Sequence, residues 1–467
     1  MTKTNHLRAI ISVCVSVMTL SACTTASTGG SSSSTTAIVP PPTPTSTPFM
    51  PATEAPDPGE VSLWVDPALP SALRDPVVEL VDGSAGRYVF VEQAEDAQLR
   101  VEMQPERPLT HWVYAVVAPF PTVRDDLALE ELQRRWDGSS ETGGLIVTGQ
   151  SAALLRKGFG VSPGETVLQV EAEHLLEDAW SAGDYYSVIP FEELEPRWKV
   201  LRLEGQSPIT KSFDPQGYPL LLPFGLSGPQ SLVDELAGKL EWPASNRDPQ
   251  RMTVVLMTGV TALTRATAWQ MERRGVLYPA EQIGDWLRGA DITHISNEVS
   301  FWADCPFPDP VQEGLKFCSD PDYFALLESV GVDVVELTGN HNKDFGAEPF
   351  LTTLELYHEA GWTTFGGGKN LADALQAAVI EHNGNRLAFL GCNQPGPRYA
   401  WASESAPGAA PCSESSLLTE TRKLRAEGLI PIFTFQWAEH ARPSESQREA
   451  FAAAAEAGAA IVSGSQA

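Results

Sequence analysis

The stretch Thr338-Gly339-Asn340-His341-Asn342-Lys343-Asp344-Phe345-Gly346 directly follows Val332–Leu337, a short run rich in valine. This run comes just after Gly331, a residue type that commonly ends a helix, so it predicts a buried strand. Open α/β sheets place their binding and catalytic groups at the carboxyl ends of their strands. We therefore expect Asn340 and His341 to lie at a functional edge of a sheet, although the same residue types also stabilise ordinary loops.

Strands and helices alternate on both sides of this stretch. Thr253–Met257, Asp291–Ser296 and Leu429–Phe435 read as strands, and Asn297-Glu298 follows the second of them as Asn340-His341 follows Val332–Leu337. A carboxylate from Glu298 and an amide oxygen from Asn340 are possible metal ligands, and a neighbouring histidine can protonate a leaving oxygen. The positions of these residues after the strands are equally consistent with a role in stabilising the loops.

Several segments of the second half form an ordered set of motifs. In chain order they are Val254–Gly259 followed by Arg265, Asn297-Glu298, Thr338–Gly346, Phe365–Gly368 with Asn370 and Ala374, Gln436–Glu439, and Val462–Gly464. This set resembles the motifs of the CapA family of capsule-synthesis proteins, which is linked to poly-γ-glutamate. The resemblance begins at Met252, covers just under half of the chain, and implies a calcineurin-like metallophosphoesterase fold, which is an α/β sandwich.

The resemblance also implies roles for individual residues. Glu298 and Asn340 would ligate a divalent metal ion (Mn, Fe, Zn or Mg), and His341 would be the catalytic proton donor. Arg265 and Asn297 would bind substrate, the arginine by contacting an anionic group.

This chain departs from the family pattern at most of the expected metal ligands. Val260 replaces the aspartate of the opening strand, Gln436 replaces the first late histidine, and Ser465 replaces the histidine expected after Gly464. The chain ends at Ala467, where the motif's last histidine would follow, so we expect the domain to be truncated. Enzymatic metal sites usually have three or more protein ligands. We therefore expect any metal to be weakly held or absent.

The first half of the chain also alternates strands with helices, and we expect an α/β domain over residues 59–240. Trp112–Phe120, followed by Leu127–Gly138, resembles a strand–helix run of type 2 periplasmic solute-binding proteins, and Tyr185–Pro190 resembles a late strand of that fold. Trp64, Trp112 and Trp136 would then either line a ligand cleft or belong to the core. Turn-forming residues at 241–250 predict a linker to a second domain over 251–467.

The amino-terminal end predicts an extracytoplasmic protein. Residues 1–23 carry two early basic residues, a short apolar segment and Leu20-Ser21-Ala22-Cys23, which resembles a bacterial lipoprotein signal lipidated at Cys23. Residues 24–58 are rich in Ser, Thr and Pro and predict a disordered tether. The four cysteines of the second half lie in two local pairs, and disulfides persist in an oxidising compartment. We therefore expect disulfides Cys305–Cys318 and Cys392–Cys412.

Charge restricts the possible partners. The 467 residues include 32 Lys and Arg against 60 Asp and Glu, a formal net charge of -28. This balance excludes nucleic acid as a general partner. It also argues against binding to an anionic membrane surface by charge, so we expect membrane attachment through a lipid anchor.

We expect a role in biosynthesis or handling of a capsule or envelope polymer, with an anionic polymer or a small solute as partner. The alternative is a non-catalytic solute-binding lipoprotein in which the first domain does the work.

Overall fold

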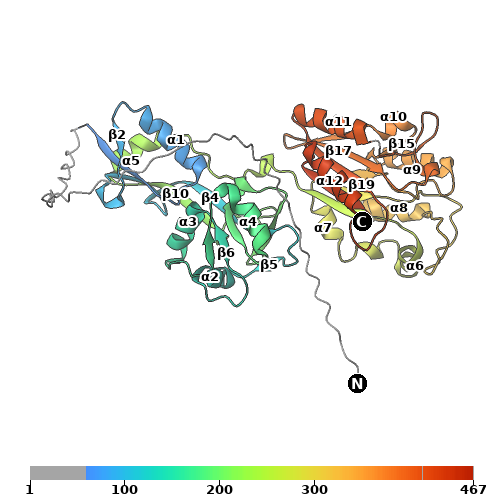
Figure 1. The fold of residues 1–467 in the computed structure, drawn as a ribbon, viewed down its shortest axis with the longest axis horizontal. Helices are drawn as coiled ribbons and strands as arrows, with labels where there is room; N and C mark the ends of the chain where they lie inside the picture. The colour runs from blue at the N-terminus through green and yellow to red at the C-terminus, as the bar shows by residue number, and fades with distance from the viewer. Residues whose placement is uncertain (1–58, 413, 466–467) are drawn as a thin grey trace, which may run out of the picture. The chain divides into compact units, whose positions relative to one another are not determined.

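The computed structural model describes residues 59–412 and 414–465 (Figure 1). The predicted signal at 1–23, its Cys23, and the predicted tether at 24–58 lie outside the described residues. Among the residues that are described, the helices are all too short or too polar to cross a bilayer.

The first half of the chain is built on one mixed sheet. Its strand order is β2-β1-β3-β10-β4-β9-β5, β8 pairs with β4, and β6 and β7 form a separate parallel pair. The strands are β1 (Val61–Val65), β2 (Tyr88–Phe90), β3 (Leu99–Met103), β4 (Arg107–Pro119), β5 (Asp126–Leu127), β6 (Leu145–Val147), β7 (Val167–Gln169), β8 (Ser187–Pro190), β9 (Trp198–Leu203) and β10 (Leu221–Ser227). The helices are α1 (Ser71–Asp82), α2 (Leu129–Asp137), α3 (Gly149–Phe159), α4 (Leu175–Ala182) and α5 (Gln230–Ala237).

Two of the tryptophans predicted to lie in a cleft or in the core belong to the core of this half. Trp112 and Trp136 are 2% and 0% exposed and belong to the hydrophobic core, so they do not line an open cleft. The Trp112 indole N–H donates to Glu192 at 2.9 Å and that of Trp136 to the Val161 carbonyl at 2.9 Å, which satisfies both buried donors.

The segment predicted as a linker partly belongs to this first half. Trp242 packs against its core, and the side chain of Asn246 accepts a hydrogen bond from the backbone N–H of Val113 at 2.8 Å. The backbone N–H of His111 donates to the carbonyl of Ala244 at 3.0 Å. Contacts of the first sheet therefore extend to Asn246.

The second half contains two four-stranded sheets. The first is parallel with order β11-β12-β13-β14, and the second is mixed with order β16-β17-β19-β20. The strands are β11 (Val255–Val260), β12 (Ile292–Ser296), β13 (Val334–Glu336), β14 (Thr363–Phe365), β15 (Gly367–Gly368), β16 (Ala378–His382), β17 (Asn385–Asn393), β18 (Gly408–Ala409), β19 (Ile430–Gln436) and β20 (Ile461–Ser465). The helices are α6 (Arg265–Arg274), α7 (Gly284–Arg288), α8 (Phe324–Ser329), α9 (Ala347–Glu359), α10 (Leu371–Ala374), α11 (Glu414–Ala426) and α12 (Glu445–Glu456).

These two sheets pack face to face and form the predicted α/β sandwich. Val334 and Phe365 of the first sheet share one buried cluster with Phe389 and Ile432 of the second. The outer face of the first sheet packs against α6, α8 and α9, and that of the second against α11 and α12. Both predicted disulfides are present, Cys305–Cys318 and Cys392–Cys412, with Cα–Cα distances of 5.9 and 5.0 Å.

Candidate functional site

The two predicted metal ligands meet at the carboxyl ends of the central strands of both sheets. Glu298 follows β12, Asn340 follows β13, and Gln436 is the last residue of β19. Gly339 allows the two loops to touch, because a Cβ at this position would lie 2.6 Å from the Cα of Glu298. The side-chain amide of Asn393, at the end of β17, donates to the Thr338 carbonyl at 2.7 Å and ties the two sheets together at this edge.

Gln436 fills the space between the two predicted ligands. Its Nε2 donates to Oδ1 of Asn340 at 3.0 Å and to Oε1 of Glu298 at 3.2 Å. Its Oε1 accepts a hydrogen bond from the hydroxyl of Ser465 at 2.7 Å. Gln436, Glu298 and Ser465 are all buried, at 0%, 5% and 6% exposure. Gln436 and Ser465, which stand where the family has histidines, therefore join Glu298 and Asn340 in one hydrogen-bonded network. These residues are far apart in the chain, so the sequence did not reveal this arrangement.

His341 is held beside this network by Asp344. Its Nδ1 lies 2.6 Å from Oδ2 of Asp344, and the hydroxyl of Tyr399 donates to the other oxygen of that carboxylate at 3.1 Å. Burial lowers the pKa of His341, but the hydrogen bond and charge of Asp344, with the charges of Glu298 and Glu439, outweigh burial and raise it above its ordinary value of 6.5. A histidine with this partner is suited to hold a proton near neutral pH.

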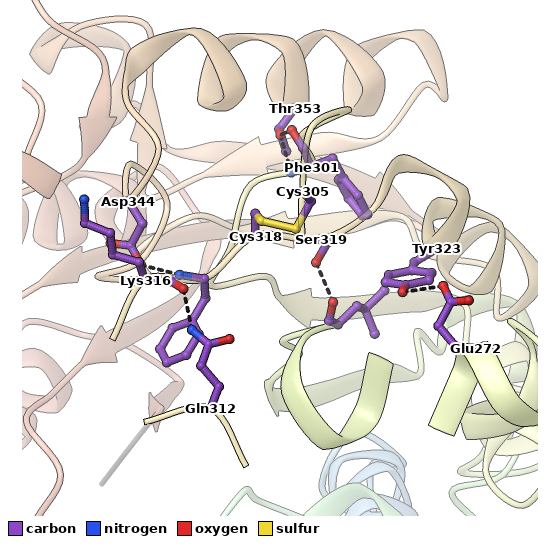
Figure 2. The surroundings of a disulfide bond; sticks show 12 residues. Glu272, Phe301, Cys305, Gln312, Lys316, Cys318, Ser319, Tyr323, Asp344 and Thr353 are labelled. Carbon is purple, nitrogen blue, oxygen red and sulfur yellow. Dashed lines mark hydrogen bonds between the residues drawn. A yellow bond between two sulfur atoms is a disulfide. The ribbon is translucent and has the colours of Figure 1, made fainter. Parts of the chain in front are cut away.

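A disulfide-closed loop packs against the histidine from a different segment. The backbone N–H of Phe317 donates to Oδ2 of Asp344 at 2.8 Å, and the Phe317 ring meets the imidazole of His341 edge-on at 4.6 Å. Figure 2 shows the Cys305–Cys318 disulfide between Asp344 and the Tyr323–Glu272 hydrogen bond. In the sequence Asp344 stands out only as part of a motif, and no local pattern there indicates a role for Phe317.

The two predicted substrate-binding residues differ in their surroundings. Arg265 is exposed at the start of α6, and its guanidinium lies 5.8 Å from the centre of the Phe317 ring, which places it near His341. Asn297 is 1% exposed, and its amide nitrogen donates to the carbonyl of Val299 at 2.7 Å and to the hydroxyl of Tyr357. The side chain of Asn297 therefore supports the loop that carries Glu298.

The donor set fits a metal ion poorly. At the end of β11, Val260 offers no ligand where the family has aspartate, and Gln436 directs N–H groups, not oxygen, toward Glu298 and Asn340. Within residues 59–412 and 414–465, no group of three or more His, Cys, Asp or Glu side chains is arranged to hold a metal. A cation between Glu298 and Asn340 would have to displace the amide of Gln436.

Comparison with known proteins identifies the second half. Residues 254–467 match the family model described as bacterial capsule synthesis protein PGA_cap. The C-terminal region is a CapA-family domain. The chain is 23% identical over 229 residues to the capsule biosynthesis protein CapA of Bacillus anthracis, a match that covers 48% of this chain and 56% of that protein. It is 28% identical over 114 residues to the uncharacterized protein y4sH of Sinorhizobium fredii, covering 24% of this chain and 25% of that protein. This chain thus spans only part of these relatives, about half of CapA.

Solved structures give distant matches. An ABC-type phosphate transport receptor from Vibrio cholerae matches 40% of this chain and 95% of its own, with a TM-score of 0.33 and 12% identity. PstS from Borrelia burgdorferi matches 38% of this chain and 91% of its own, with a TM-score of 0.29 and 9% identity. Similarity at this level assigns no ligand to either half.

Proposed function

We propose that this protein takes part in making or handling a capsule or another envelope polymer, from a lipid anchor at Cys23 on the outer side of the membrane. The CapA-family domain supports the capsule-related role, as does the similarity to a protein named for capsule biosynthesis. The two disulfides support an extracytoplasmic location, because disulfides persist mainly in oxidising compartments.

Within this role, the C-terminal domain acts by binding polymer and not by metal-dependent hydrolysis. The observation that carries this proposal is the contact of one amide nitrogen, Nε2 of Gln436, with both Glu298 and Asn340. Both protons of that nitrogen are directed at the oxygens that a metal would need, and the buried amide is satisfied on its other side by Ser465. Gln436, Glu298, Asn340 and Ser465 thus form one hydrogen-bonded network without a cation.

Metal analysis of the full chain tests this proposal. The protein is dialysed against chelator-free buffer with manganese or zinc, its metal content is measured by mass spectrometry, and hydrolysis of bis(p-nitrophenyl) phosphate is followed. We expect little bound metal and little turnover from the unaltered protein. The combined changes Val260→Asp, Gln436→His and Ser465→His should raise metal content, because they return a carboxylate and two imidazoles to the positions where the family has them.

A matched control separates ligand recovery from a general effect of mutation. Ser465→Ala alone removes one hydroxyl and adds no ligand, so its metal content should equal that of the unaltered protein. Near-stoichiometric metal and rapid phosphodiester turnover in the unaltered protein would contradict the proposal.

A further inference from the structure

A cavity of about 520 Å³ lies in the C-terminal domain next to the Gln436 network. Its lining includes the two tryptophans Trp401 and Trp437, the disulfide-bonded Cys412, and the polar residues Gln394, Ser446 and Glu449. The backbone N–H of Gln394 donates to the carbonyl of Gln436 at 3.0 Å, so the rim of the cavity adjoins the candidate site. Small-molecule pockets commonly have volumes of about 300–1,000 Å³, so the cavity has the size of a ligand site.

The aromatic side chains of this cavity are fixed in place. The indole N–H of Trp401 donates to Oδ1 of Asn393 at 2.9 Å. Trp437 is 5% exposed, and its ring packs edge-on against Phe435 at 5.9 Å and Phe451 at 6.2 Å. The wall residue Cys412 is joined by the disulfide to Cys392 on β17. Trp437 therefore belongs to the packed wall, and the partly exposed ring of Trp401 presents an aromatic surface that needs little ordering when a ligand binds.

Polar groups stand at the rim of this aromatic surface. Gln394 follows β17, Ser446 and Glu449 lie on α12, and all three side chains are exposed. Together they offer an amide, a hydroxyl and a carboxylate, which can both donate hydrogen bonds to hydroxyl groups and accept them. Among the described residues that line the cavity there is no lysine, arginine or histidine to pair with an anion.

This combination matches the chemistry of an uncharged sugar ring. A pyranose has apolar C–H faces that pack on aromatic rings and a belt of hydroxyl groups that hydrogen-bond to amides and carboxylates. An anionic unit such as glutamate would meet the carboxylate of Glu449 without a basic partner, in a chain whose formal net charge is -28. The cavity therefore favours a neutral saccharide over an anionic polymer.

We propose that this cavity is a binding site for a neutral hexopyranose unit of an envelope glycan. The proposal rests on the proposed polymer-binding function and names its substrate class. A ring of the saccharide lies against Trp401, and Gln394 and Glu449 bind its hydroxyl groups.

Calorimetry and saturation-transfer NMR on the full chain test this site with defined probes. The neutral probes are maltotriose, cellotriose and chitotriose, and the anionic probes are poly-γ-glutamate and trigalacturonate. We expect at least one neutral trisaccharide to bind with a Kd in the millimolar range or tighter, and the anionic probes to bind at least about tenfold more weakly. Gln394→Ala combined with Glu449→Ala should weaken neutral binding by about tenfold or more, because two hydrogen-bonding groups are lost.

Glu445→Gln is the matched control, because Glu445 is an exposed residue on the same helix that does not line the cavity. Its binding should equal that of the unaltered protein, which separates the local contact from a change in overall charge. Absence of neutral binding, full binding by the rim variant, or preference for an anionic probe would each overturn the saccharide site. None of these results alters the metal content or phosphodiester turnover that tests the proposed function.

Discussion

The backbone N–H of Phe317 donates to Oδ2 of Asp344 at 2.8 Å, and the same oxygen lies 2.6 Å from Nδ1 of His341. Phe317 precedes Cys318, whose disulfide to Cys305 closes the loop. The partner of the site histidine is thus oriented by a loop that a covalent bond holds in place. The second disulfide, Cys392–Cys412, lies on β17 and beside the cavity, and supplies a comparison within the same chain.

We predict that replacing each disulfide with a pair of serines lowers the free energy of unfolding by about 3 kcal/mol. The two bridges join residues 13 and 20 positions apart, and loops of about this length give that value in the chain-entropy model. Urea unfolding of the two double variants measures it. The double variant Cys305→Ser, Cys318→Ser should also change the titration of His341, because its loop orients Asp344 through Phe317. The variant that lacks the other disulfide should not. Equal effects of both double variants on that titration would contradict the link through Phe317.

The second prediction concerns the protonation of His341. Asp344→Asn removes the charge that contributes most to raising the pKa of His341, while burial still lowers it, so this pKa should fall relative to that of the unaltered protein. NMR titration of the imidazole signals measures the shift directly. Tyr399→Phe is the control, because it removes a hydrogen bond to the same carboxylate but leaves its charge. An unchanged titration in the asparagine variant would show that Asp344 does not determine it.

The same pKa sets a pH dependence of stability. Because the pKa of His341 is raised in the folded protein, its protonation stabilises the fold fully below pH 6.5, and this contribution is lost as pH rises through the folded-state pKa. As the pH rises from below 6.5 through the folded-state pKa, the free energy of unfolding of the unaltered protein should fall relative to that of the His341→Gln variant. Parallel curves for the two proteins would count against the raised pKa.

A fourth prediction concerns the hydrogen-bonded network between the predicted metal ligands Glu298 and Asn340. Gln436→Leu keeps the approximate volume but removes the amide that donates to Glu298 and Asn340. Loss of a partner by a buried polar group costs about 1–3 kcal/mol, so we expect a loss of this size in urea unfolding. Ser465→Ala, which removes a single donor to Gln436, should cost less. A leucine variant as stable as the unaltered protein would show that the network does not contribute.

Local signals in the sequence predicted much of the second half. An aspartate followed by a proline is typical of a helix start, and Oδ1 of Asp320 accepts from the backbone N–H of Asp322 at 2.9 Å at the start of the 3-10 turn Pro321–Tyr323. An Asn-Gly pair is typical of a tight hairpin turn, and at Asn383-Gly384 both residues have the positive φ values, 50° and 78°, that this turn requires. Each of these signals lies within a few residues of the structure that it determines.

Features that depend on distant segments could not be predicted in this way. Strand β10 contains Pro223 and Gly225, which oppose a strand assignment, yet Gly225 is needed because a Cβ there would lie 2.1 Å from the carbonyl oxygen of Arg107. The sequence shows that Gln436 stands where the family pattern has a histidine ligand. It did not show that its amide binds Glu298, 138 residues away, because only the packed sheets bring them together.

The last prediction concerns attachment to the membrane. We expect Cys23→Ser to release the protein into the soluble fraction, because Leu20-Ser21-Ala22-Cys23 follows a short apolar segment typical of a lipoprotein signal. A single acyl chain gives only marginal membrane binding, so stable attachment requires the multiply acylated form of Cys23. Fractionation of cells and mass spectrometry of the amino-terminal peptide measure both points. Cys14→Ser is the matched control, since this cysteine lies inside the apolar segment and should leave attachment unchanged. A Cys23→Ser protein that stays in the membrane fraction would show that another segment anchors it.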